Sequence, residues 1–128
     1  MEYLPNVKWN EIKIQNIDVI KNKPGIYIFS TKQKIDNKYA VNYIGQSVNL
    51  QDRIINHFSD SEENKDLKRH IGKGYLMKIS YTYIDEEYLD GVELFLYNYY
   101  KPTFNKQSPP GDKQISCNLP NVRKYNHY

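Results

Sequence analysis

Alternation of apolar and polar positions along the chain predicts three β-strands. The first covers residues 25–31 and the second residues 39–44, and the polar connection between them allows the two to pair as an antiparallel hairpin. The third strand is expected at residues 75–83, where the alternation is strict. This arrangement places Tyr27 and Tyr43 on neighbouring strands.

Apolar residues that recur at helical spacing predict three helices. The first follows Asn49, which is expected to cap it, and ends near Phe58. The charged residues 61–73 predict a short second helix. The third and longest is expected at residues 85–100, where Pro102 marks its end.

Together these elements predict one α/β (α+β) domain, a central three-stranded antiparallel sheet flanked by helices. A chain of 128 residues is long enough for one core, so a second domain is not expected. We expect the domain at residues 24–106, preceded by an N-terminal extension at residues 1–23 and followed by an irregular C-terminal tail at residues 107–128. The extension is expected to hold a short helix around Ile14 to Ile20.

Charge and cysteine content change this picture only slightly. A formal charge of +3 and a pI near 8.8 fit a polyanionic partner and equally fit many unrelated proteins. The single cysteine, Cys117, rules out an internal disulfide framework, so a reducing compartment, the cytoplasm, is expected. No apolar run approaches the roughly 20 residues that cross a bilayer, and the N-terminus has no signal pattern, so no membrane partner is expected.

Tyrosine is unusually frequent, with 13 residues against one tryptophan. Tyrosines can stack on bases or donate to phosphate, but amphipathic packing is the better interpretation of any one of them. A basic edge is expected on the helix at residues 61–73, and a solvated face explains it better than a dedicated patch; its members are Lys65, Lys68, Arg69 and Lys73.

Five residues carry the chemistry that phosphodiester hydrolysis needs. The reaction requires a base for water, a cation for the phosphate and a carboxylate that holds a metal. Each candidate has an ordinary structural interpretation by itself, but the predicted sheet and helices can bring all of them to one sheet edge. The candidates are Tyr27, Tyr43, Arg53, His57 and Glu93.

Glu93 is the residue whose setting most demands explanation. On a helix, its neighbours three and four positions away include no lysine or arginine. If buried, its carboxylate therefore needs a metal, a distant arginine, or a shifted pKa that keeps it neutral. The alternative is that Glu93 points to water.

These residues occur in an order that resembles the GIY-YIG nuclease family. The resemblance spans roughly residues 24–105 and rests on two tripeptides and an ordered series behind them: Gly25-Ile26-Tyr27, Tyr43-Ile44-Gly45, Asn49-Leu50, Arg53, His57, Glu93, Pro102 and Asn105. It implies a small mixed fold and endonuclease activity with one divalent ion, Mg²⁺ or Mn²⁺.

The resemblance also implies roles. Glu93 would bind the metal, Arg53 would neutralise the scissile phosphate, and Tyr27 would act as general base with help from His57. Tyr43 would orient the attacking water or exchange roles with Tyr27. A phenol is a poor base at neutral pH unless positive charge lowers its pKa, and we expect Arg53 and the metal to do so.

Three further positions bear on substrate binding. Asn105 would hold the sheet edge or the substrate by hydrogen bonds. Gln46 stands where several relatives have lysine, so Lys73 or another basic residue is expected to compensate. The tripeptides are also further apart than in many relatives, which predicts an elongated hairpin loop with contacts of its own.

Substrate and partners remain open at this point. DNA, single-stranded or duplex, is the expected partner, and RNA is an alternative. Sequence specificity should be limited unless the protein forms a homodimer or acts with another partner. Two competing classes are a catalytically silent nucleic-acid-binding module of the same fold and a protein-interaction domain.

Overall fold

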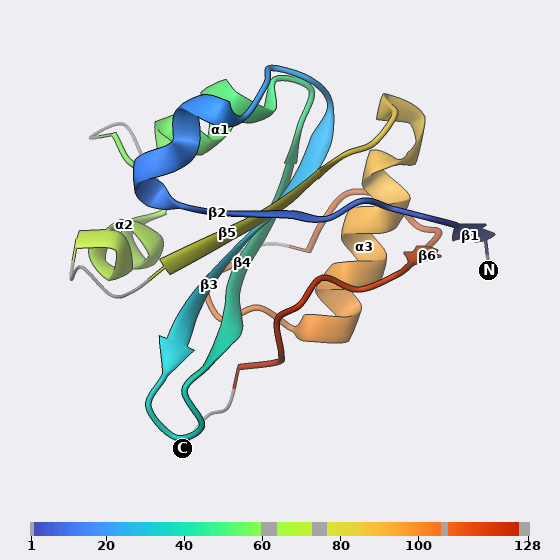
Figure 1. Cartoon of the computed structure of the whole chain (residues 1–128). Helices are drawn as coiled ribbons and strands as arrows, with labels where there is room; N and C mark the ends of the chain where they lie inside the picture. Colours follow the sequence, from blue (N-terminus) through green and yellow to red (C-terminus); the bar gives the residue numbers. More distant parts are fainter. Residues whose placement is uncertain (1, 60–63, 73–76, 106–107, 126–128) are drawn as a thin grey trace.

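A computed structural model of the chain describes residues 2–59, 64–72, 77–105 and 108–125 (Figure 1). Its main element is a four-stranded antiparallel sheet in the order β2-β5-β3-β4, formed by β2 (Asn10–Lys13), β3 (Gly25–Gln33), β4 (Lys38–Ser47) and β5 (Met77–Tyr83). The three predicted strands are confirmed, but the prediction of a three-stranded sheet missed β2. This strand has only four residues, three of them exposed, so it lacks a clear alternation.

A second, two-stranded sheet joins the N-terminal residues to the C-terminal tail. Strand β1 (Glu2–Leu4) pairs in parallel with β6 (Ile115–Cys117). The prediction of an irregular C-terminal tail is therefore wrong at β6. A three-residue strand whose partner lies at the other end of the chain leaves no local pattern.

Helices cover both faces of the main sheet (Figure 1). The first face carries the 3-10 helix η1 (Ile14–Val19), where a short helix was expected, and also α1 (Leu50–His57) and α2 (Lys65–Gly72). Its core contains Tyr27, Phe29, Leu50, Ile54, Leu67, Ile79 and others. In the part of the chain that the structure describes, no helix is long and apolar enough to cross a membrane.

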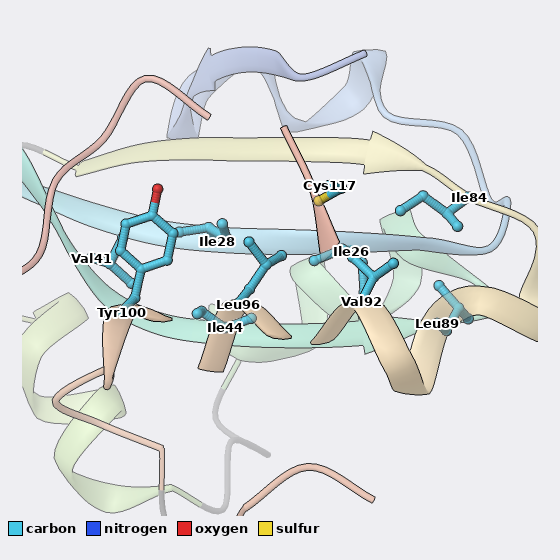
Figure 2. Packing of buried hydrophobic residues seen from close by; sticks show 10 residues of the cluster. All are labelled: Ile26, Ile28, Val41, Ile44, Ile84, Leu89, Val92, Leu96, Tyr100 and Cys117. Atoms are coloured by element: carbon cyan, nitrogen blue, oxygen red, sulfur yellow. The ribbon is translucent and has the colours of Figure 1, made fainter. Parts of the chain in front are cut away.

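The second face carries α3 (Leu89–Tyr100) and the C-terminal tail. A short 3-10 helix, η2 (Glu86–Tyr88), precedes α3, so the helix predicted at residues 85–100 is present in two parts. Figure 2 shows the core on this face, where Ile26, Ile28, Val41 and Ile44 of the sheet pack against Leu89, Val92, Leu96 and Tyr100 of α3. Strand β3 thus contributes alternate residues to two cores.

The extra length between the two tripeptides lies in the strands and not in the loop. Strand β3 continues to Gln33 and β4 begins at Lys38, so only residues 34–37 form the turn. The predicted elongated loop is wrong, because the polar residues between the tripeptides extend the ladder. Figure 1 shows the resulting hairpin reaching beyond the other strands.

Strand β4 is an edge strand, and the segments after α3 cover it. Arg123 accepts a hydrogen bond from the Val41 amide and donates one to the Tyr39 carbonyl, and the Phe104 amide donates to the Asn42 carbonyl. Such cover protects an edge from pairing with other chains.

The start of α1 corrects one local prediction. Asn49 makes no side-chain cap hydrogen bond; instead, Asn22 Oδ1 accepts a hydrogen bond of 2.9 Å from the Asp52 amide in the first turn. The cap therefore comes from a residue distant in sequence, which helical spacing cannot reveal.

Candidate active site

The site is built at the open end of the β3–β4 hairpin, away from its turn, where both tripeptides lie. Tyr27 of β3 and His57 of α1 are each 1% exposed, and the Tyr27 hydroxyl lies 2.6 Å from His57 Nε2. His57 lies on the buried side of its helix together with Leu50 and Ile54. The contact links the first tripeptide to the helix that follows the second tripeptide.

Aromatic rings enclose the His57 imidazole. Its ring centroid is 5.4 Å from that of Tyr27, 5.2 Å from that of Phe29 and 5.0 Å from that of Tyr43. Tyr27 and Tyr43 lie on neighbouring strands, as predicted, with centroids 6.1 Å apart. Of the two phenols, Tyr27 is buried and Tyr43 is only half-buried, so Tyr43 lies nearer to solvent.

The glycine of the second tripeptide makes room for the tyrosine of the first. Gly45 pairs with Tyr27 across the two strands, and a Cβ atom at Gly45 would lie 2.4 Å from the Tyr27 hydroxyl oxygen. Gly25 is constrained in a similar way, because a Cβ there would lie 2.4 Å from the Thr82 carbonyl oxygen. Both glycines are therefore required by close approach.

Burial dominates the electrostatics of Tyr27. It raises the pKa of the Tyr27 hydroxyl well above its usual range; Tyr43 adds to the rise, and the charge of Glu93 acts in the same direction. The half-buried Arg53 lowers this pKa, as predicted, but its effect is smaller than that of burial. The net shift of the Tyr27 pKa is therefore upward, and the decrease expected from Arg53 together with a metal stays a prediction. Both charges nevertheless act on the phenol, which places Arg53 and Glu93 near it.

Glu93 has the outside partner that its sequence setting requires. It is 6% exposed, and the Gln46 side-chain amide donates a hydrogen bond of 2.9 Å to its Oε1 atom. Burial raises the pKa of Glu93 to about 7; the Gln46 hydrogen bond opposes the rise and the charge of Asp90 adds to it. Of the expected remedies for a buried carboxylate, the shifted pKa is present.

Asp90 was not singled out from the sequence. The same Gln46 nitrogen donates to Asp90 Oδ1 at 2.8 Å, so one amide joins two carboxylates that lie one helical turn apart on α3. The spacing of three residues was the only available signal, because i and i+3 share a helix face. The exposed Asp90 lies at the rim and Glu93 lies inside.

Asn105 takes the first of its two expected roles. Its Oδ1 accepts a hydrogen bond of 3.0 Å from the Ile44 amide, and its Nδ2 donates one of 2.8 Å to the Ile44 carbonyl. The side chain thus holds the β4 edge between Tyr43 and Gly45.

The basic residues expected near α2 can be placed only in part. Lys73 lies outside the described residues, whereas Lys65, Lys68 and Arg69 are exposed, as predicted.

The donor set at this site suits a hard cation. In the described ranges, no group of three or more histidine, cysteine, aspartate or glutamate side chains could hold a metal. Mg²⁺ needs no such cage, because it keeps several waters and binds through one or two carboxylates together with substrate phosphate. The buried carboxylate of Glu93, whose Oε1 atom accepts the Gln46 hydrogen bond, fits this mode.

Comparison with protein families agrees with the geometry. The model of the GIY-YIG catalytic domain matches residues 23–107, which is more than half of the chain and includes both tripeptides, α1 and Glu93. Searches of curated proteins and of solved structures found no match. With the ordered motifs gathered at one end of one sheet, the chain belongs to the GIY-YIG nuclease family.

Proposed function

We propose that this chain is a divalent-metal-dependent endonuclease that hydrolyses phosphodiester bonds of DNA with one ion, and that residues 24–106 form its catalytic unit. The observation that carries the proposal is the buried hydrogen bond of 2.6 Å between Tyr27 and His57, set where the charges of Arg53 and Glu93 both act on the phenol. A purely structural tyrosine would not require this convergence.

The raised pKa of Tyr27 favours a relay over a standing phenolate. The Tyr27 oxygen accepts a proton from the attacking water while its own proton passes to His57 Nε2. The phenol then stays neutral throughout, so burial of Tyr27 does not oppose the transfer, and the positive charge forms on the His57 imidazole. Tyr43, half-buried on the neighbouring strand, orients the water.

The remaining residues handle the phosphate. Arg53 neutralises charge that develops on the phosphate in the transition state. Glu93 would hold the ion, Mg²⁺ or Mn²⁺, and Gln46 keeps its carboxylate in place. A bound ion would polarise a phosphoryl oxygen and stabilise the departing alkoxide. Gln46 and Lys73 remain proposed contacts to substrate, and Asn105 holds the strand that presents Tyr43.

Incubation of the purified protein with plasmid, single-stranded DNA and RNA tests the proposal. Cleavage in Mg²⁺ or Mn²⁺ is expected, and both chelator and Glu93→Ala should abolish it. Glu86→Ala, which removes an exposed carboxylate from η2, is the matched control and should cleave normally. DNA that stays intact but is retarded on a gel would indicate the alternative, a catalytically silent binding module. If the protein neither cleaves nor retards nucleic acid, both the nuclease and the binding module are overturned. Dimerisation and the cytoplasmic location remain predictions.

A further inference from the structure

Lysines from three neighbouring strands gather at the end of the main sheet where the turn of the β3–β4 hairpin lies. The register pairs Lys13 of β2 with Lys78 of β5, and Lys78 with Ser30 of β3. Lys32, two residues after Ser30, pairs with Tyr39 of β4. Paired residues and those two apart on a strand share a face, so these side chains lie together on the second face of the sheet. We call Lys13, Lys32, Tyr39 and Lys78 the hairpin face.

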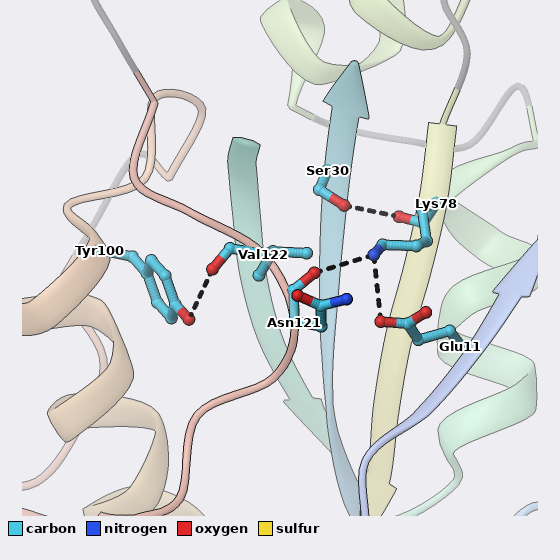
Figure 3. A network of polar contacts seen from close by, with 6 residues as sticks. All are labelled: Glu11, Ser30, Lys78, Tyr100, Asn121 and Val122. Carbon is cyan, nitrogen blue, oxygen red and sulfur yellow. Dashed lines mark hydrogen bonds and ion pairs between the residues drawn. The ribbon is translucent and has the colours of Figure 1, made fainter. Parts of the chain in front are cut away.

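Lys78 organises this surface. Its ammonium group donates to Glu11 Oε1 at 3.0 Å and to the Asn121 carbonyl at 2.9 Å (Figure 3), and it lies 4.8 Å from the centroid of the Tyr39 ring. Lys32 lies 6.0 Å from the same ring. Both the ring and Lys78 are therefore held in place before any ligand binds.

Two lysines of the hairpin face have no carboxylate partner in the described part of the chain. Lys13 and Lys32 are exposed and form no ion pair with a carboxylate anywhere in the described chain. Lys13 also lies directly opposite Lys78, although like charges across a ladder are destabilising. Such an arrangement has a physical reason if an anion binds there.

Two cavities flank the Tyr39 ring and Lys78, with volumes of about 490 and 450 Å³. The first is also lined by Lys13, Asn16 and Glu11, whose carboxylate is paired with Lys78, and the second by Lys38. Cations and side-chain amides around an aromatic ring suit the phosphates and sugars of a nucleic acid better than an apolar ligand.

We propose that the hairpin face binds the phosphate backbone of the substrate nucleic acid at a distance from the scissile bond. This inference rests on the proposed function for the nature of the substrate. Lys32 is five residues from Tyr27 along β3, a separation of about 17 Å in an extended strand, and this odd spacing puts its side chain on the opposite face of the sheet from the Tyr27 ring. The hairpin face therefore contacts different phosphates from those at Tyr27 and Arg53, and the lengthened hairpin provides the reach.

The test compares two double variants with equal loss of charge. Lys13→Gln/Lys32→Gln changes the hairpin face, and Lys8→Gln/Lys113→Gln removes two exposed lysines that lie outside it. Binding of a fluorescein-labelled DNA duplex, and of its single strand, is measured by anisotropy in chelator at several salt concentrations. The hairpin variant should bind about tenfold more weakly at 0.1 M salt and lose about 2 from the salt slope, because each phosphate contact releases about 0.9 counterion. The control should stay within about twofold.

Equal weakening in both double variants, or none in either, would overturn the inference. Hydrolysis of a small phosphodiester, thymidine 5′-p-nitrophenyl phosphate, which reaches only the catalytic residues, separates this result from the proposed function. The hairpin variant should hydrolyse it at the wild-type rate. If the wild type fails to hydrolyse it but the binding difference persists, the proposed nuclease is contradicted and the nucleic-acid surface stands.

Discussion

The ring of Tyr27 occupies the space that any side chain at position 45 would need. The two residues are paired across β3 and β4, and an added Cβ at Gly45 would also lie 2.4 Å from the Tyr27 Cζ atom. The tyrosine of one tripeptide and the glycine of the other are thus two halves of one packing arrangement, which directs the phenol towards His57.

Gly45→Ala should destabilise the fold by about 2 kcal/mol, because the new methyl group must displace a ring that is held by the core. Chemical denaturation measures this loss. In a Tyr27→Ala background the clash is absent, so the same substitution at Gly45 should cost much less. An equal cost in both backgrounds would show that the ring does not constrain position 45.

Tyr27→Phe should lower kcat by about 100-fold or more while the protein still folds and binds DNA, because only the proton relay is lost. His57→Gln, which retains an acceptor for the Tyr27 hydroxyl but no basic nitrogen, should cause a similar loss. The double variant should be no slower than either single one, since the two residues act as a unit. Turnover that survives in Tyr27→Phe would transfer the role of base to Tyr43 or His57.

Arg53→Ala should reduce the cleavage rate by about 100-fold to 1,000-fold with little change in melting temperature, because in the proposed mechanism the half-buried guanidinium stabilises transition-state charge and does not hold the core. Single-turnover cleavage and thermal unfolding measure the two quantities. Arg53→Lys keeps the charge and should recover part of the rate. A large fall in melting temperature would identify Arg53 as a structural residue.

Stability in chelator should decrease as pH rises from 5 to 8. Burial raises the pKa of Glu93 to about 7, so the folded state holds this proton more tightly than the unfolded state does. The contribution is complete below the unfolded pKa near 4.5 and is lost as pH passes through 7. Glu93→Gln, which stays neutral, should be more stable than wild type at pH 8 by about 3 kcal/mol. Parallel pH profiles of the two proteins would show that Glu93 is not the titrating group.

Metal affinity should increase with pH as Glu93 loses its proton, because a carboxylate must be deprotonated to bind a cation. Isothermal titration calorimetry with Mn²⁺ is expected to give about tenfold weaker binding for each pH unit below 7, and little change in affinity above pH 7. Asp90→Asn should weaken binding far less than Glu93→Gln if Glu93 is the principal ligand. Binding that is independent of pH would place the ion elsewhere.

Much of the site could be predicted because its signals are local. The alternation around Tyr27 and Tyr43 predicted their strands, and the apolar spacing after Asn49 predicted the helix that carries Arg53 and His57. The ordered motifs also indicated the family that the domain match establishes. Strands β1, β2 and β6 escaped prediction because their few residues are ordered by partners far along the chain.

The sequence by itself therefore determined the three long strands, the helices and the residue types that a nuclease of this family requires, since these depend on residue type and on neighbours in the chain. The tertiary structure alone decided the partners: His57 for Tyr27, Gln46 for Glu93 and the Ile44 backbone for Asn105. It also decided the pKa values of Tyr27 and Glu93, because desolvation depends on every atom packed around a group. That packing brings together residues from all parts of the chain.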